Sequence, residues 1–413
     1  MAAIAGLRGT GDWATDERPK NFLEMILWLN PNGDTPINGF LAKSSTKATD
    51  DPEFSWFEET LDILQLQLND ATGMLAADTA VVVDSGALNL VPGDILLVEK
   101  AGTNQTATYD NELVRVTSVT NDTSFAISRG EAGTTAAPIA DNDYLLNVGS
   151  VSEEGTASPA STTRNPTKVS NFTQIFKTTY SITGTAASTR TRTGDPIAND
   201  KKRKIFDHSR KLEYSWIFGQ PFENLTGAVN GKPERFTGGF LHFLSSLATS
   251  RIVVKSANYT AGNIDVFFDD VFDVFDFTNP NGGTSDQRLA VVGNGALNAI
   301  NKLAAHAGQV EFGDVVTQYG MELTRLRMPQ GNIFLRSHPL LNRHKTVYTN
   351  TMIIIDPKGL QYRPLKGRDT RFKDNIQAND EDSVKGQWMT EAGLEFHHLE
   401  TMKCITNIGW SAV

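Results

Sequence analysis

The most suggestive chemistry in this sequence is a cluster of carboxylates between residues 268 and 276. Phe268-Asp269-Asp270-Val271-Phe272-Asp273 has the spacing DDxxD, in which aspartates can hold a magnesium ion and a pyrophosphate group. On a helix, Asp269, Asp270, Asp273 and Asp276 would share one face, which suits a divalent cation. The sequence lacks the second metal-binding motif that this chemistry needs, and the same pattern describes an amphipathic helix with a solvated acidic side. We therefore predict no metal site here.

Other short patterns with catalytic precedents fail on their context. Gly293-x-Gly295 could open a phosphate loop, but Asn298 stands where a third glycine is needed, so a tight turn explains the pair. Ser44-x-x-Lys47 has the spacing of an acylating serine and its lysine but lacks the partner motifs. On a strand, His397 and His398 would point to opposite faces and could not share a metal ion. Cys404 lies in an apolar segment, which favours a buried side chain over a nucleophile. We predict no catalytic, cofactor-binding or metal-binding residue, and no enzymatic activity.

The bulk composition narrows the class of protein. The 413 residues allow two or three domains, and a net charge of −10 with a sequence pI near 5.3 argues against a primary role in nucleic-acid binding. A single cysteine rules out an intrachain disulfide framework and a multi-cysteine zinc site. No apolar run reaches the length of about 18 residues that a membrane span needs. Met1–Gly11 lacks the pattern of a secretory signal, so we expect synthesis in the cytosol.

The element that organises the chain is a long helix at residues 200–219. We expect Asn199 or Asp200 to cap its start and Gly219 to end it, which gives a rod of about 30 Å. One side of this helix is cationic, and its apolar side holds Ile205, Leu212 and Trp216. A single long helix after an irregular, β-rich beginning indicates a scaffold rather than an active site.

Residues 75–149 are of a different kind. Short β-type runs recur there at roughly ten-residue spacing with turn residues between them, as in a small barrel or sandwich. The segment up to residue 150 holds ten acidic residues against three basic ones, which is −7 of the total charge of −10. The pattern predicts an independently folded, acidic, all-β insertion with strands at Ala80–Val83, Asp94–Glu99, Leu113–Val119, Ser124–Ser128 and Tyr144–Val148.

Residues 156–193 reverse that charge, with five cations and no acid. Phe172, Phe176, Tyr180 and Ile182 share one parity, which favours a long β-arm with one apolar face, although the high Ser and Thr content also fits a low-complexity linker. A basic arm on an otherwise acidic chain is suited to self-association. Our hypothetical inter-subunit contacts are therefore the arm aromatics and the cations of arm and helix: Trp56, Phe57, Arg164, Lys168, Lys177, Arg190, Arg192, Lys202, Arg203 and Arg210.

Behind the helix, residues 220–413 predict an α+β region. We expect a loop at 366–384 and a final strand or strand pair at Glu395–Asn407. The other expected elements are strands at Arg288–Val292, Val315–Arg327, Asn332–Arg336, Thr351–Asp356 and Leu360–Leu365, and a helix at Ala296–Ala307.

This order of parts resembles the major capsid protein of tailed bacteriophages, which has the Hong Kong 97-type fold. Lys211-Leu212-Glu213-Tyr214 with Phe218-Gly219 is similar to the end of the spine helix in one such family. Arg325–Pro329 and Ile353-Ile354-Ile355-Asp356-Pro357 resemble its axial-domain strands, and Glu391–Ile408 resembles its closing peripheral-domain strand. The resemblance covers roughly residues 20–74 and 150–413; the acidic insertion departs from it.

The resemblance implies a division of the α+β chain into an N-terminal arm, an extended β-loop, a peripheral domain with the spine helix, an axial domain and the inserted all-β domain. The corresponding ranges are 1–52 for the arm, 53–74 and 150–196 for the extended loop, 75–149 for the insertion, 197–221 and 371–413 for the peripheral domain, and 222–370 for the axial domain.

The resemblance also implies a function. Copies of the chain would form pentamers and hexamers and close into an icosahedral shell of the virion around double-stranded DNA, which they would contact non-specifically. Portal and scaffold proteins would be partners, a decoration protein a possible one, and no membrane or cofactor would take part. Two alternatives stay open: a tail or baseplate protein, and a magnesium-dependent enzyme of prenyl diphosphates built on the carboxylates above.

Overall fold

The computed structural model describes residues 35–42, 46–59, 64–99, 111–158, 163, 165–191, 193–227, 229–260, 262, 264–276, 287–307, 312–318, 321–328, 330–343 and 348–411. They form two compact units, which we call the barrel unit (residues 57–167) and the main unit (residues 1–56 and 168–413). Each unit has its own buried core. No helix in the described ranges is long and apolar enough to cross a membrane.

The barrel unit is a six-stranded sheet that closes on itself. Its strand order is β2-β7-β4-β5-β6-β3, and Leu68 bridges Val83 just beyond β2 and β3, which joins the two ends of the sheet. Closure removes the exposed strand edges that an open sheet would present to other chains. The strands are β2 (Gln65–Gln67), β3 (Ala80–Val82), β4 (Asp94–Glu99), β5 (Leu113–Asn121), β6 (Ser124–Glu131) and β7 (Tyr144–Ser150), with a 3-10 turn at Ala87–Asn89.

A buried ion pair fastens the loops at one end of this barrel. Arg129 donates through Nε to Glu112 Oε1 at 2.7 Å and through Nη1 to the Leu75 carbonyl at 2.9 Å. The same carboxylate accepts the backbone N–H of Gly130 and of Ala137, both at 3.1 Å. Burial alone would raise the pKa of Glu112, but the hydrogen bonds from Arg129 and the two amides outweigh it and lower that pKa.

The largest sheet of the main unit has seven strands in the order β12-β21-β17-β13-β16-β15-β14. β13 lies parallel to β16 and antiparallel to β17, and β12 lies parallel to β21. Its strands are β12 (Ile252–Val254), β13 (Gln287–Val292), β14 (Phe312–Gln318), β15 (Met321–Met328), β16 (Gly331–Ser337), β17 (Met352–Ile355) and β21 (Lys403–Thr406).

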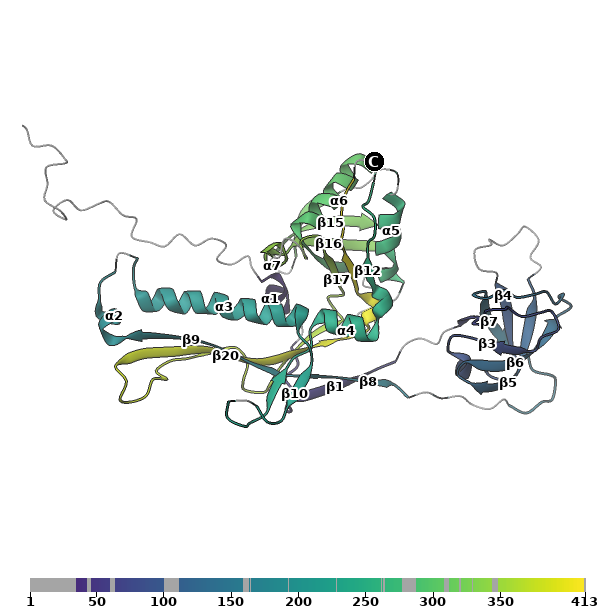
Figure 1. The fold of residues 1–413 in the computed structure, drawn as a ribbon, viewed down its shortest axis with the longest axis horizontal. Coiled ribbons are helices and arrows are strands. Elements are labelled where there is room, and N and C mark those ends of the chain that lie inside the picture. Colours follow the sequence, from purple (N-terminus) through teal and green to yellow (C-terminus); the bar gives the residue numbers. More distant parts are fainter. Residues whose placement is uncertain are drawn as a thin grey trace, which may run out of the picture. The chain divides into compact units, whose positions relative to one another are not determined.

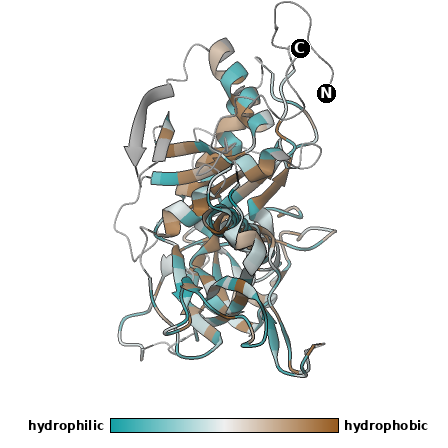
Figure 2. Ribbon diagram, turned by 90° about the vertical axis from the view of Figure 1, so that its left-hand side faces the viewer, coloured by the Kyte–Doolittle hydropathy of each residue, from teal (hydrophilic) through white to brown (hydrophobic). Residues whose placement is uncertain are grey.

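Helices cover both faces of this sheet, and strand alternation decides which residue meets which helix. Ala290 and Val292 of β13 pack in the core that contains α5 (Ile264–Phe272) and α6 (Asn294–Ala307). Leu289 and Val291 face the opposite core, with α4 (Phe240–Leu247). Hydrophobic residues gather in the central strands in Figure 2. Cys404 is buried in this second core, and burial raises the pKa of its thiol to about 12.

A second sheet of the main unit carries the long helix. α3 (Pro196–Phe218) lies along β9 (Gln174–Thr183) and β20 (Ser383–Phe396), as Figure 1 shows. β20 also pairs with β18 (Leu360–Pro364) and β19 (Arg371–Lys373).

The start of α3 corrects our expectation of a cap at Asn199 or Asp200. The helix begins one turn earlier, where the Asp195 side chain accepts the Ile197 N–H at 2.9 Å and Pro196 occupies the first helical position. Proline suits that position because its missing N–H would have no helical partner. The predicted end at Gly219 is confirmed by the bond from its N–H to the Ser215 carbonyl.

Smaller elements connect these sheets. β1 (Glu53–Glu58) pairs with β8 (Thr167–Phe172), and β10 (Phe222–Asn224) forms a hairpin with β11 (Glu234–Phe236). The remaining helical segments are α1 (Pro36–Leu41), α2 (Gly184–Ser188) and α7 (Pro339–Arg343), with 3-10 turns at Thr249–Arg251, Asp273–Phe275 and Leu399–Thr401.

The α+β class is confirmed, while several element boundaries differ from expectation. The expected strand Val315–Arg327 is the hairpin of β14 and β15, and β19 interrupts the expected loop 366–384. Glu395–Asn407 is divided between β20 and β21, which belong to different sheets. His398 therefore lies in a turn with φ 51° rather than on a strand beside His397. The barrel unit includes β2 before the expected insertion 75–149 and the end of β7 after it.

Candidate functional site

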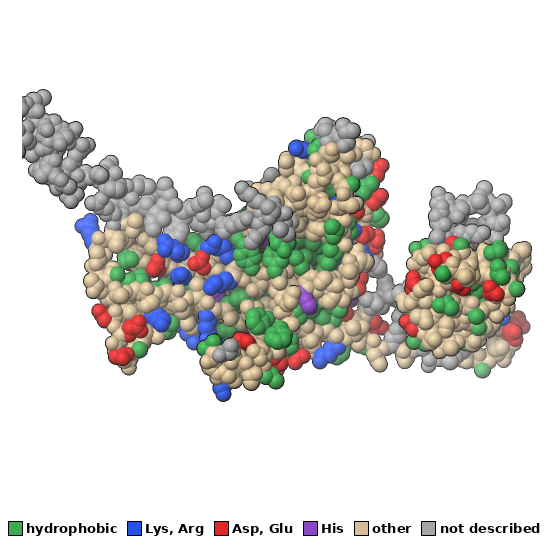
Figure 3. Space-filling model, viewed as in Figure 1, with side chains coloured by type: hydrophobic (Ala, Val, Ile, Leu, Met, Phe, Trp, Pro, Cys, Tyr) green, Lys and Arg blue, Asp and Glu red, His purple; other side chains and the backbone are tan. Residues whose placement is uncertain are grey.

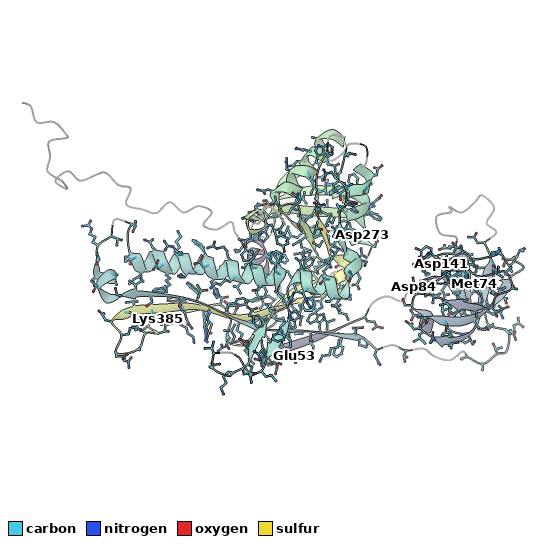
Figure 4. The ribbon with its side chains drawn as sticks, in the orientation of Figure 1. Glu53, Met74, Asp84, Asp141, Asp273 and Lys385 are labelled. Atoms are coloured by element: carbon cyan, nitrogen blue, oxygen red, sulfur yellow. The ribbon has the colours of Figure 1, made fainter. Side chains whose placement is uncertain are left out.

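Two of the three carboxylates with the DDxxD spacing, Asp270 and Asp273, form ion pairs within the main unit. α5 ends at Phe272, and Asp270 accepts hydrogen bonds from Lys255 and from the Tyr259 hydroxyl, both at 2.6 Å. Asp273 pairs instead with Arg251 at 2.9 Å and with Lys403 at 2.8 Å; Figure 4 labels Asp273 beside the C-terminal strand. Among the described residues no group of three His, Cys, Asp or Glu side chains could hold a metal ion. The aspartates therefore join segments distant in the sequence.

The two arm aromatics differ in exposure. Trp56 is only 7% exposed and packs inside its own chain against Phe54, Phe243 and His397. Phe57, the next residue along β1, has 66% of its side chain exposed. Strand alternation explains the contrast, because neighbouring residues point to opposite faces. Of these two expected contacts, only Phe57 offers a large apolar surface to a second molecule.

The root of the N-terminal arm is fixed to α3. The fully buried Glu213 carboxylate accepts the N–H groups of Ile37 at 2.7 Å and Asn38 at 2.9 Å, the first donors of α1. Asn38 in turn donates to the Ser209 carbonyl and accepts from the Trp216 indole, both at 2.8 Å. A carboxylate at a helix N-terminus satisfies donors that the helix itself leaves free. The arm segment 35–42 therefore belongs to the core of its own chain; residues 1–34 lie outside the described ranges.

A buried histidine joins α3 to the sheet beneath it. His208 is fully buried, with Nδ1 3.2 Å from the Thr178 hydroxyl on β9 and Nε2 2.8 Å from the Thr390 hydroxyl on β20. Burial and the nearby Lys211 charge lower the pKa of His208 to about 4. At neutral pH the ring is therefore uncharged and acts as a structural crosslink between three elements.

The predicted cations fall into two groups. Arg203 and Arg210 of α3 pair with Asp200 and Asp207 on their own helix, so part of their charge is neutralised within the chain. Figure 3 shows the Lys and Arg side chains spread along this part of the surface. The second group consists of Lys168 on β8, Lys177 on β9, Arg190 and Lys202, which are exposed, as Arg203 of the first group is too. Arg164 and Arg192 lie outside the described residues.

The β10–β11 hairpin exposes an apolar surface that we did not predict. Phe222 and Phe236 stand opposite each other with ring centroids 6.2 Å apart and are 58% and 44% exposed. Leu225 and Val229 nearer the tip are 66% and 99% exposed. The base is closely packed: a Cβ on Gly219 would lie 2.3 Å from the Thr237 carbonyl oxygen. Two phenylalanines flanking the Asn230-Gly231 turn were the available sequence signal.

The sheet beneath α3 also brings together cations that the sequence did not group. Arg371 and Lys373 lie on β19 and Lys385 on β20, in a stretch that we expected to be largely loop. Their register places them on the same face as Lys177 of β9. The alternation Arg371-x-Lys373 was a weak strand signal, and the pairing with β20 could not be read from it.

Comparison with known proteins gives a consistent result. The family described as SU10 major capsid protein matches residues 7–409. The major capsid protein of Pseudomonas phage PaMx41 is 25% identical over 382 residues, which is 92% of this chain and 87% of that protein.

Among solved structures, that of Microbacterium phage Oxtober96 superposes with a TM-score of 0.43 at 9% identity and covers 95% of this chain and 96% of that one. The SrpI encapsulin of Synechococcus elongatus PCC 7942 has a TM-score of 0.40 at 9% identity, and the coverage is 60% of this chain and 77% of that one.

Proposed function

The chain belongs to the SU10 major capsid protein family, and on that premise we propose that its copies form pentamers and hexamers and close into an icosahedral phage head. It is a structural, non-enzymatic protein of the virion capsid, as our sequence comparison with tailed-phage capsids predicted. The observation that carries the proposal is the extent of the family match, which runs through both compact units of the chain.

The order of elements in the main unit and the contacts of α3 support this proposal. The order of arm, extended β-segments, long helix, sheet domain and returning C-terminal strands is the order that the Hong Kong 97-type fold requires. The long α3 is tied to the arm root through Glu213 and to the sheet through His208. These buried contacts hold α3, the arm root and the sheet in a fixed arrangement, so the surfaces of the subunit keep their relative positions. Many weak contacts between such subunits, repeated by symmetry, add up to a stable shell.

We further propose which residues contribute to those contacts. Phe57, Lys168, Lys177 and Arg190 are exposed and keep the role that the sequence suggested, and the hairpin aromatics Phe222 and Phe236 join them. Contiguous exposed apolar side chains on a protein surface often mark a protein–protein interaction site. Arg164, Arg192, Lys202, Arg203 and Arg210 remain candidates on the same basis of charge.

The proposed shell also implies partners. It would enclose double-stranded DNA and touch the phosphates without reading sequence. A portal ring and a scaffold protein would take part in assembly, and the barrel unit would stand in for, or accompany, a decoration protein.

The test is to purify the full chain and examine it by size-exclusion chromatography with light scattering and by negative-stain electron microscopy. Closed particles tens of nanometres across are expected. Stacked rings or fibres of a tail-like assembly would contradict the proposal, and so would a species that stays monomeric at every concentration even when it is co-expressed with its scaffold and portal.

A further inference from the structure

The sheet that carries α3 has a second face, and that face is cationic. Phe176, Thr178 and Tyr180 of β9 are buried toward α3, so the alternate residues of β9 point the other way. Lys177 and Arg371 both stand opposite Met389 of β20, one from each side, and Lys373 stands opposite Gln387. Lys385 lies two residues further along β20, opposite Ser181. Register therefore places all four cations on one face.

This face holds an excess of positive charge. None of Lys177, Arg371, Lys373 and Lys385 has a carboxylate partner within the part of the chain that the structure describes. The acids of β20 with the same parity, Glu391 and Glu395, are 4% and 3% exposed and already pair with Arg368 and Arg363. Arg371 and Lys373 are about 7 Å apart along β19, and Lys373 and Lys385 are diagonal neighbours on adjacent strands at about 7–8 Å. Lys177 lies two strands away from Arg371, at about 10 Å, so all four positive charges repel one another. A ligand with negative charge would relieve that repulsion.

The barrel unit carries the opposite excess. Residues 57–167 contain sixteen acidic and four basic residues, a net charge of −12, whereas the other 302 residues contain 32 acidic and 34 basic ones, a net charge of +2. Arg115 and Arg129, two of the four basic residues, pair with Glu131 and Glu112. Asp84, Glu153 and Glu154 are exposed, and within the described ranges their side-chain carboxylates make no hydrogen bond or ion pair. Figure 4 labels Asp84 on the barrel and Lys385 on the sheet.

We propose that the cationic sheet face, defined by Lys177, Arg371, Lys373 and Lys385, binds the acidic surface of the barrel unit of a second copy of this chain. The proposal rests on the shell function above, which brings many copies together. Complementary charge fixes which surfaces meet and speeds their encounter, and its effect weakens as salt screens it. Thr179, Ser181 and Gln387 lie between the cations, and the apolar Met389 beside them is only 2% exposed, so we expect a mainly electrostatic contact with the exposed Ile175 at its edge.

The test begins with the full chain carrying Lys177→Glu, Lys373→Glu and Lys385→Glu. Particle yield at low salt should fall about ten-fold or more relative to the unchanged chain, because each contact becomes repulsive. The matched control carries Lys47→Glu, Lys302→Glu and Lys366→Glu, which alters net charge equally at exposed sites on other surfaces. The control should assemble normally, and circular dichroism should show that both variants are folded.

A charge swap then identifies the partner. A second chain carries Asp84→Lys, Glu153→Lys and Glu154→Lys; mixing it with the first variant should restore particles. Recovery only when all six changes are on one chain would indicate a contact within a chain and overturn the proposal.

Two further outcomes would also overturn the proposal. One is unchanged particle yield of the first variant. The other is normal yield with reduced co-purifying DNA, which would assign the face to nucleic acid. If the unchanged chain forms no particles under any condition, the shell function itself fails.

Discussion

The two units of this chain achieve stability in different ways. The barrel unit buries one core within the single continuous segment 57–167, and its sheet closes on itself. The main unit joins residues far apart in the chain: β12 pairs with β21, β9 with β20, and α1 docks on α3. The barrel is therefore a compact unit formed by one continuous segment, whereas the main unit is held together by contacts between segments far apart in the sequence.

The strongest way to break this comparison is to remove one large core residue from each unit. Trp216→Ala in the main unit and Phe125→Ala in the barrel each delete a side chain that is at most 2% exposed, at a cost of about 3–5 kcal/mol. Differential scanning calorimetry should show two transitions, of which each substitution lowers only one. A common shift of both transitions would show that the units unfold as one.

A smaller effect should come from the carboxylate that holds the arm root. Glu213→Gln keeps the size of the side chain but weakens its bonds to the Ile37 and Asn38 N–H groups, so we expect a loss of about 1–3 kcal/mol confined to the main unit. Hydrogen exchange at those two amides should accelerate more than exchange in the barrel. Glu112→Gln is the matched change in the barrel; it should spare the α1 amides.

The stability of the two units should also depend on pH in different ways. The pKa of His208 is about 4 in the folded protein against an ordinary value of 6.5, so the unfolded chain binds more protons between these values. Main-unit stability should therefore fall as pH drops from 6.5 to 4. The pKa of Glu112 is lowered from 4.5, so its contribution to barrel stability is present above pH 4.5 and is lost only below it.

Calorimetry at pH 7 and pH 5 checks this difference. His208→Gln should flatten the main-unit slope while the barrel transition stays in place. A barrel transition that fell as steeply as that of the main unit between these pH values would contradict the assignment.

The smallest effect is expected on the solvent side of α3. Arg203→Ala removes an exposed ion pair with Asp200, in which the Arg side chain is 53% exposed, and should cost less than about 1 kcal/mol. If this change lowered the main-unit transition as much as Glu213→Gln does, the distinction between buried and surface contacts of α3 would be wrong.

The difference between local and long-range contacts also explains which features could be predicted from the sequence. In the barrel, Ala80–Val83, Asp94–Glu99 and Tyr144–Val148 were recognised as strands because alternation and turn residues are local signals. In the main unit, local signals found α3 and β13 but missed the Asp195 cap, the division of Glu395–Asn407 and the docking of α1. The cap formed by Asp195 before Pro196 is a local pattern that could have been recognised. The other two features depend on pairing with segments far away in the sequence, which no short pattern encodes.

The same distinction applies to the candidate inter-subunit contact residues. Exposure of Lys177 and burial of Phe176 followed from alternation, and the prediction of one apolar face on β9 is confirmed for Phe176, Tyr180 and Ile182. Phe172 lies instead at the end of β8, where Thr173 separates it from β9. The burial of Trp56 and the grouping of Arg371, Lys373 and Lys385 beside Lys177 required the strand register.

The most direct test of the account compares the full chain with one that lacks the barrel. Because β1 and β8 are paired, a Gly/Ser linker of about six residues can join Glu59 to Asn165. Electron microscopy of the shortened chain should show closed particles of the same diameter, which come apart at lower salt than those of the full chain. A shortened chain that is folded and soluble yet forms no particles would contradict the claim that the main unit builds the shell.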